Sequence, residues 1–199
     1  ELRPGAMGKP TPGNKVEIID EDGEILPPGE VGDIALHRDS PALFKEYYED
    51  PERTEEAMRG DYYITGDLAS RDEDGYFWFE GRSDDIIISS GYTIGPFEVE
   101  DALIKHPAVK ESAVVASPDE IRGSVVKAFI VPRDGVDTED PNLIPELQEH
   151  VKQHTAPYKY PRKIEFIDEL PRTISGKIRH VELRSREYAK YRNKNKETL

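Results

Sequence analysis

The hydrophobic positions in the first third of the chain recur with the period of short β-strands. Polar and apolar residues alternate along 15–19, and apolar stretches at 31–36 and 76–79 follow turns rich in Asp, Pro and Gly. Between these stretches, residues 51–60 have the marks of a short helix, with Asp50 as its N-cap. The pattern predicts a small β-rich barrel or sandwich that contains one short helix.

After residue 82 the pattern alternates between the periods of strands and helices. Apolar residues recur every four positions at Leu143, Leu147 and Val151, as on the buried face of a helix. Helices are predicted at 96–105, 142–154 and 179–191, and strands at 85–88, 92–94, 112–116, 125–131 and 163–167. The fold class expected from both parts is α+β, with a domain boundary at the short charged link 82–85.

Composition narrows the function classes. The chain has 199 residues, 36% of them hydrophobic, and a formal net charge of −14, which disfavours nonspecific binding to nucleic acid. It has no Cys, which excludes disulfides and fits a reducing compartment, so we expect a cytoplasmic location. No apolar run approaches the length of a membrane span. Because residue 1 is Glu and the first Met is Met7, we expect a piece of a longer chain.

One lysine, Lys177, lies in a segment (170–177) that proline and glycine bound, which predicts a loop. A lysine ammonium on such a loop is a mobile point charge with three donors, suited to a developing oxyanion or a phosphate. Taken alone, a loop lysine is most often merely solvated. Whether Lys177 is functional must therefore be judged from the other motifs.

Two motifs near the domain boundary allow a structural and a functional interpretation. Residues 65–67 (Thr-Gly-Asp) are either a plain turn or a tight turn whose Asp67 carboxylate accepts hydrogen bonds from both hydroxyls of a ribose. Arg82 either forms a surface ion pair with Asp84 or Asp85, or binds a ribose or phosphate.

A glycine-containing turn and a pair of histidines also allow more than one interpretation. Residues 89–92 are either a plain hairpin turn or a narrow slot in which Gly91 lets a thin ligand pass. His150 and His154 share one helix face, but no third ligand follows with the spacing of a zinc protease. No metal site is predicted in this chain.

Taken together, four ordered motifs resemble the C-terminal part of the adenylate-forming superfamily of acyl- and aryl-CoA synthetases, luciferases and peptide-synthetase adenylation domains. These motifs are 63–67, 81–85, 90–92 and 171–177. The resemblance extends to about Tyr188. Within the superfamily the chain is most similar to medium-chain acyl-CoA synthetases, through residues 89–96, 122–123 and 155–163.

The resemblance implies a division of the chain into two domains. Residues 1–82 would be the β-rich, barrel-like end of a large AMP-binding domain, which is incomplete here. Residues 83–199 would be the small, mobile α+β C-terminal domain, with the hinge at 82–85. The implied partner is the N-terminal adenylation domain upstream of Glu1, which carries most of the ATP site and the acyl pocket.

The implied activity is that of an AMP-forming acid–thiol ligase. Such an enzyme activates a carboxylic acid, here a short- or medium-chain fatty acid, with Mg²⁺ and ATP, and passes the acyl group to CoA. By resemblance, Lys177 offsets the negative charge where the carboxylate meets the α-phosphate. Asp67 would bind the ribose hydroxyls, Arg82 the ribose or a phosphate, and Asp84 would be the hinge for domain rotation.

The resemblance also implies a set of residues for CoA, a second ligand. These are Ser90, Gly91 and Tyr92 along the pantetheine, and Arg122, Lys152 and Tyr160 toward the nucleotide. The chain departs from the family at Thr93, where an arginine is usual. Loss of that guanidinium removes a charged contact and puts CoA affinity, domain packing or the identity of the acceptor in question.

Other interpretations stay open at this point. The chain is expected to be inactive in adenylation by itself, because the triphosphate loop and acyl pocket lie upstream. A peptide-synthetase or luciferase-like adenylation domain shares most of the motifs. A noncatalytic module that binds a nucleotide or a protein is an alternative from a different class.

Overall fold

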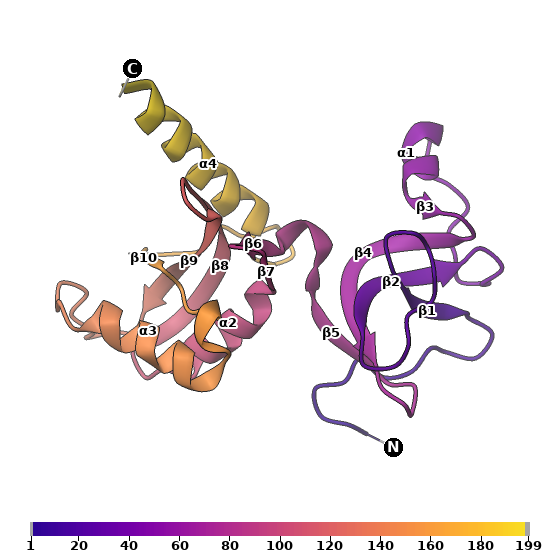
Figure 1. The fold of residues 1–199 in the computed structure, drawn as a ribbon, viewed down its shortest axis with the longest axis horizontal. Helices are drawn as coiled ribbons and strands as arrows, with labels where there is room; N and C mark the ends of the chain where they lie inside the picture. Colours follow the sequence, from indigo (N-terminus) through magenta and orange to yellow (C-terminus); the bar gives the residue numbers. More distant parts are fainter. Residues whose placement is uncertain (1, 198–199) are drawn as a thin grey trace. The chain divides into compact units, whose positions relative to one another are not determined.

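The computed structural model describes residues 2–197 of the chain (Figure 1). It divides into two compact units, Glu1–Asp84 and Asp85–Leu199, called unit 1 and unit 2 below. Each unit has its own hydrophobic core. The roles expected for the two parts, an AMP-binding domain and a mobile C-terminal domain with a hinge at 82–85, stay a prediction.

Unit 1 is built on one five-stranded antiparallel sheet, in which the strands follow the order β1-β2-β4-β3 and β5 pairs with β4. Its elements are β1 (Val16–Ile19), β2 (Val31–His37), α1 (Pro51–Glu56), β3 (Met58–Arg59), β4 (Tyr62–Arg71) and β5 (Phe77–Arg82). The buried cluster Ile18, Ile34, Ala69 and Phe77 comes from four different strands and holds the sheet together.

Sequence reasoning was wrong about part of this unit. The helix expected at 51–60 starts as predicted, with the Asp50 side chain accepting from the Arg53 amide, but it ends at Glu56. Met58 and Arg59 instead pair with β4, because strand pairing satisfies their backbone groups better than a further helical turn. The strand β4 itself was missed, since Gly66 and a polar run interrupt its apolar alternation.

Unit 2 is an α+β unit whose sheet follows the order β10-β9-β6-β7, with β8 paired to β9. Only the pairing of β10 with β9 is parallel among the described strands. Its elements are η1 (Ser83–Asp85, at the unit boundary), β6 (Ile87–Ser89), β7 (Tyr92–Ile94), α2 (Pro96–Ile104), β8 (Val109–Asp119), β9 (Gly123–Pro132), α3 (Leu143–His154), η2 (Pro157–Lys159), β10 (Lys163–Phe166) and α4 (His180–Glu197).

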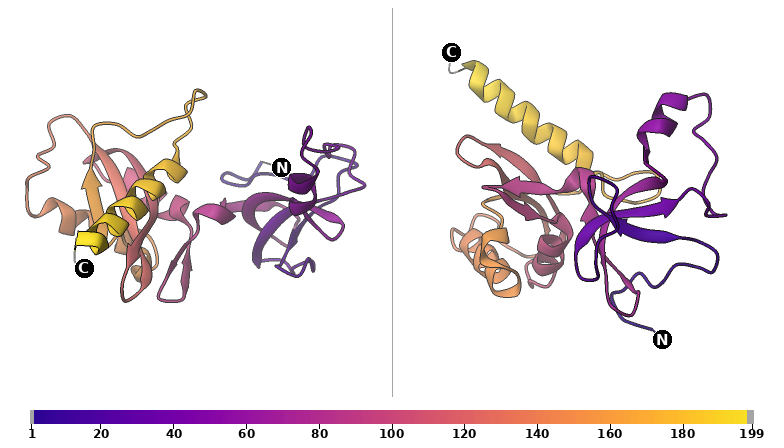
Figure 2. Two further views of the ribbon diagram at one scale, coloured as in Figure 1. Left: turned by 90° about the horizontal axis from the view of Figure 1, so that it is seen from above. Right: turned by 45° about the vertical axis from the view of Figure 1, so that its right-hand side comes forward.

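Helices cover both faces of this sheet (Figure 2). The helices α2 and α3 bury apolar side chains such as Val99, Leu103 and Leu147 with Val114 from β8. The helix α4 lies on the opposite face, where Leu183 packs in a second cluster. Successive residues of β8 and β9 point to opposite faces, and because both faces are covered the two strands are buried along most of their length.

Most of the expected elements of unit 2 are confirmed, and with them the α+β fold class. The helices α2 and α3 and their buried residues lie where the sequence placed them, whereas α4 runs to Glu197, past its expected end at about 191. The two central strands are longer than expected and run from Val109 to Asp119 and from Gly123 to Pro132. In residues 2–197, no helix is both long enough and apolar enough to span a bilayer.

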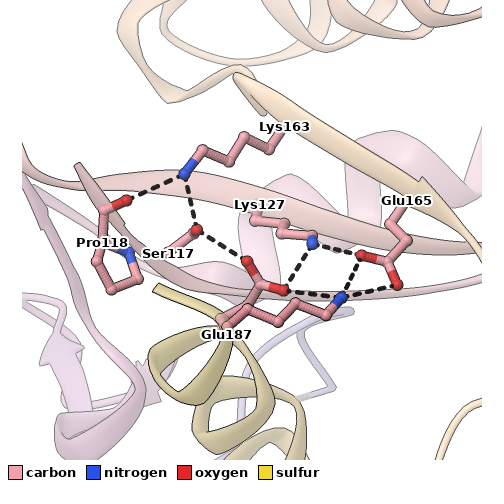
Figure 3. A network of polar contacts seen from close by, with 7 residues as sticks. Ser117, Pro118, Lys127, Lys163, Glu165 and Glu187 are labelled. Carbon is pink, nitrogen blue, oxygen red and sulfur yellow. Dashed lines mark hydrogen bonds and ion pairs between the residues drawn. The ribbon is translucent and has the colours of Figure 1, made fainter. Parts of the chain in front are cut away.

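The attachment of α4 to the sheet depends on charged groups (Figure 3). The buried Lys127 ammonium of β9 lies 2.7 Å from Glu187 of α4 and 2.5 Å from Glu165 of β10. The Ser117 hydroxyl of β8 donates to Glu187 at 2.9 Å, and Lys190 pairs with both carboxylates. Burial alone would raise the pKa of Glu187, but the hydrogen bonds from Lys127 and Ser117 lower it below its ordinary value.

A histidine cluster lies where α2 ends against α3. The ring of His150 is 5.0 Å from that of His106 and 4.1 Å from that of His154. The Nε2–H of His150 donates to the Ala102 carbonyl at 3.0 Å, and His106 contacts Glu146 at 3.2 Å. Burial lowers the pKa of His150, and the neighbouring histidines lower it further. The hydrogen bond to the Ala102 carbonyl raises this pKa, but by less.

The first prediction concerns the buried ion pair. Glu187→Gln should lower the free energy of unfolding of unit 2 by about 2 kcal/mol, because charge-assisted hydrogen bonds are lost while Glu165 still compensates Lys127 in part. Glu149→Gln, which removes an exposed carboxylate on α3, should cost less than about 0.5 kcal/mol. Urea unfolding followed on amide signals of unit 2 measures both. Equal stability of the two variants would contradict this account.

The second prediction concerns pH. The pKa of His150 is lower in the folded chain than its unfolded value of about 6.5. Its contribution to stability is therefore complete above about pH 6.5 and is lost as the pH falls from there through the folded pKa. Between pH 7.5 and 5.5, the wild-type chain should lose stability in unit 2 relative to His150→Gln. The control His37→Gln, in unit 1, should follow the wild type. The same NMR-detected unfolding gives the result, and parallel pH curves for wild type and His150→Gln would refute the assignment.

Candidate functional site

The Thr-Gly-Asp motif lies in a bulge of β4 rather than in a tight turn between elements. Along β2, Asp33 and Ala35 pair with Leu68 and Ile64, so residues 65–67 together oppose a single residue. The Thr65 hydroxyl donates to the Ile34 carbonyl at 3.0 Å and accepts from the Asp67 amide at 3.2 Å. Bulges redirect side chains out of the ladder, and here the bulge leaves the Asp67 side chain partly exposed.

Arg82 joins this bulge from β5, where it pairs in register with Asp67. Its guanidinium donates to Asp67 at 3.2 Å and to Asp84 at 3.1 Å. Gly66 adopts φ +78°, and a Cβ there would meet the guanidinium at 3.0 Å, so glycine permits this close approach. Burial lowers the pKa of Arg82, but its pairing with Asp84 and Asp67 outweighs that effect and raises it.

The structure thus brings three residues expected from the sequence into one cluster in unit 1. Asp67, Arg82 and Asp84 are all partly exposed, so a ligand in solvent can reach them. Carboxylates that accept and a guanidinium that donates, side by side, match the hydroxyls and phosphate of a nucleotide. The same groups also match one another, because the Arg82 guanidinium pairs with the carboxylates of Asp67 and Asp84.

The loop that carries Lys177 is a small hairpin with a fixed backbone. Arg172 and Ile178 form an antiparallel bridge, and the Thr173 amide donates to the Lys177 carbonyl at 2.8 Å. Gly176, with φ +86°, closes the turn by donating to the Thr173 carbonyl at 2.9 Å. The sequence predicted a loop over 170–177, and these contacts hold the backbone from Arg172 to Ile178 as a hairpin.

The side chain of Lys177 has a different environment from its backbone. The residue is exposed, and among the side chains that the structure describes (residues 2–193) its ammonium has no ion-pair partner. A nearby cation, Arg172, is instead neutralised by Glu111 and also donates to the Gly176 carbonyl. The hairpin therefore presents one positive charge at the end of a flexible stem on a rigid base.

The expected pantetheine segment is the turn between β6 and β7. Ser90 and Gly91 have φ of +50° and +83°, as in the two central positions of a type I′ hairpin turn. The Ser90 amide donates to the Arg122 carbonyl at 3.3 Å, so two residues expected to share a ligand are neighbours. Asp119 fixes the Arg122 loop by accepting from the amide of Arg122, which lowers the pKa of Asp119.

Aromatic rings extend this surface in a way that the sequence only partly indicated. The ring of Tyr92 stacks on that of Tyr158 at 4.4 Å. Two cations lie over the Tyr160 ring, Lys152 at 4.7 Å and Arg162 at 4.9 Å. Tyr158 and Arg162 were missed as site residues, although they lie in the segment 155–163 that carried the closer resemblance.

The expected CoA residues thus fall into two groups in unit 2. Ser90, Gly91 and Arg122 form one around the β6–β7 turn, to which Tyr92 adds its ring. Lys152 and Tyr160 form the other. Thr93 pairs with Ile88 in the hairpin and is exposed, so it leaves space where an arginine is expected. In the part of the chain that the structure describes, no group of three or more metal-ligating side chains is found.

Part of the chain matches a known domain family. Residues 98–177 match the model of the AMP-binding enzyme C-terminal domain, a match whose last residue is Lys177. The chain is 69% identical over 186 residues to the uncharacterized acyl--CoA ligase YtcI of Bacillus subtilis (strain 168) and covers 35% of that protein. It is 60% identical over 192 residues to the mitochondrial acyl-coenzyme A synthetase ACSM3 of Rattus norvegicus and covers 33% of it. In both comparisons 94% of this chain is aligned.

A solved structure gives the same result for the fold. The anthranilate CoA ligase AuaEII, in complex with anthranoyl-AMP, matches with a TM-score of 0.85 and 38% identity. That comparison covers 96% of this chain and 36% of the other. The chain spans about a third of the length of the curated relatives that it matches. It is therefore homologous to acyl-CoA synthetases along that third of their length, and its residues 98–177 match the model of the AMP-binding enzyme C-terminal domain.

Proposed function

We propose that this chain is the C-terminal part of an AMP-forming acyl-CoA synthetase. The full-length protein would join a short- or medium-chain fatty acid to AMP from ATP and then transfer the acyl group to the thiol of CoA. The observation that carries the proposal is the Lys177 hairpin, an exposed ammonium on a fixed backbone at the end of the family match. Identity to acyl-CoA ligases over 94% of the chain supports the same reaction class.

In the first half-reaction the carboxylate of the acid attacks the α-phosphate of ATP, and pyrophosphate leaves. Two anions must approach each other, so a cation placed at the forming P–O bond lowers the barrier. Lys177 supplies that cation in our proposal. Its fixed backbone limits the entropy lost on binding, while the flexible stem lets the ammonium follow the charge as it shifts.

Asp67 and Arg82 would hold the nucleotide. The Asp67 carboxylate accepts from the ribose hydroxyls, and the guanidinium of Arg82 donates to the ribose or a phosphate. Mg²⁺ would enter bound to ATP, since residues 2–197 offer no cluster of metal ligands. Asp84, paired to Arg82, is the proposed hinge residue.

In the second half-reaction the thiolate of CoA attacks the acyl carbonyl, and AMP leaves. We propose that the β6–β7 turn, with Ser90, Gly91 and Tyr92, lines the path of the pantetheine. Arg122, Lys152 and Tyr160 would bind the nucleotide end, where phosphates need cations and the adenine a ring to stack on. The remaining expectation, a cytoplasmic location, stays a prediction.

The third prediction separates the two half-reactions in the full-length protein. Lys177→Ala should reduce acyl-adenylate formation by about 10² to 10³-fold, because the cation acts at the developing charge. Thioester formation from preformed acyl-adenylate and CoA should change by less than about threefold. Release of pyrophosphate and of acyl-CoA measures each step.

Two controls belong to this experiment. Lys110→Ala removes an exposed lysine of β8 and should leave both steps unchanged. The 199-residue chain alone should release no pyrophosphate. The proposal is wrong if full-length protein releases none with any fatty acid, or if Lys177→Ala and Lys110→Ala behave alike.

A further inference from the structure

The carboxylate of Glu100 connects three elements of unit 2. Its Oε1 accepts from the Val114 amide of β8 at 2.7 Å and lies 2.7 Å from Nε2 of His180, the first residue of α4. The Glu100 carbonyl also accepts from the Ser112 hydroxyl at 3.3 Å. Glu100 is therefore held from β8 on both its side chain and its backbone, and it offers His180 a fixed acceptor.

A second charged contact follows one helical turn later on α4. The Arg184 guanidinium lies 2.6 Å from the Asp85 carboxylate, and both side chains are mostly buried. Asp85 is the last residue of η1, and one residue separates it from β6. His180 and Arg184 are four residues apart, so they lie on the same face of α4.

The charges facing His180 favour its protonated form. Glu100 faces His180 from α2, and Asp85 faces it from η1. The cation Arg184, which pairs with Asp85, lies one turn further along α4. The hydrogen bond to Glu100 raises the pKa of His180 above its ordinary 6.5, although burial opposes this. Protonated His180 balances the two carboxylates against two cations. Neutral His180 leaves one partly buried carboxylate without a matching charge.

Lys177 is joined to His180 by a short and rigid connection. Two residues separate them, and the first, Ile178, forms the bridge with Arg172 that closes the hairpin. The second, Arg179, donates its amide to the Pro171 carbonyl at 2.8 Å and accepts from the Leu183 amide at 3.4 Å. The hairpin and the first turn of α4 therefore share hydrogen bonds, and a change in one is carried to the other.

We propose that protonated His180 is a positioning residue for Lys177. It holds the first turn of α4 to Glu100 through a charge-assisted hydrogen bond, so that the hairpin keeps a single orientation, and loss of its proton weakens that bond and loosens both. The positioning itself is a property of this chain. Its consequence for adenylation rests on the function proposed for Lys177.

The direct test is an NMR titration of the 199-residue chain. In the wild type, the amide signals of Gly176 and Lys177 should shift with the same midpoint as the imidazole of His180. In His180→Arg, which keeps the cation and does not titrate in this range, those shifts should vanish while the signals stay at their low-pH positions. His154→Gln, which removes an exposed histidine of α3, should leave the titration unchanged.

A second variant keeps the test independent of how well the arginine fits. Glu100→Gln should lower the midpoint of His180, because the charged acceptor is lost, and move the Gly176 and Lys177 shifts with it. The proposal is overturned if the two amides do not follow the His180 midpoint in the wild type. It is also overturned if they titrate unchanged in His180→Arg.

The consequence for activity is measured in the full-length protein. Acyl-adenylate formation should fall about tenfold as pH rises through the His180 midpoint, and His180→Arg should remove that fall. Thioester formation from preformed adenylate should not follow the same midpoint. If no variant forms acyl-adenylate at any pH, the proposed function is wrong, while the NMR titration still decides the positioning.

Discussion

The attachment of α4 to the sheet is the constraint on which the placement of Lys177 depends. The polypeptide leaves the sheet after β10, forms the Lys177 hairpin and returns along α4. On the face of α4 that meets the sheet, Leu183 is a fully buried apolar anchor, and most other contacts are ionic. Charge-assisted hydrogen bonds are directional, so they fix the rotation and register of a helix more sharply than apolar packing does.

The same contacts explain how so polar a helix can be a stable part of the unit. Buried charges are costly unless each is paired and hydrogen-bonded. The Lys127 ammonium contacts two carboxylates, and the Glu187 carboxylate accepts from both Lys127 and Ser117. These contacts offset the cost of removing Lys127 and Glu187 from water. Within the described residues, no buried side-chain nitrogen or oxygen lacks a hydrogen-bond partner.

The sequence predicted most of unit 2 and less of unit 1, for a physical reason. The helices α2 and α3 bury regular apolar stripes, and the long strands β8 and β9 are apolar on both faces, so periodicity alone reveals them. In unit 1, β4 carries a bulge at residues 65–67 and mostly half-buried residues, which destroys the alternation. The sequence indicated the Thr-Gly-Asp motif as a candidate, yet it did not predict the strand around that motif.

The candidate site divides in a similar way. Asp67, Arg82 and Lys177 were found from short motifs, because each motif is local in sequence. Glu187, Glu100 and His180 were not, because their partners lie between 60 and 80 residues away and only the fold brings them together. The residues proposed for the site thus follow from local motifs in the sequence, whereas the groups that hold them in place are seen only in the structure.

The central claim is that the hairpin of Lys177 and α4 form one piece that charged contacts hold to the sheet. Hydrogen–deuterium exchange of the 199-residue chain at neutral pH tests it most directly, by comparing the wild type with Glu187→Gln. We predict that exchange accelerates more at the amides of Thr173, Gly176 and Leu183 than in α2 or α3, where it rises only with the lower stability of unit 2. Unchanged exchange in the hairpin, or equal acceleration throughout unit 2, would contradict the claim.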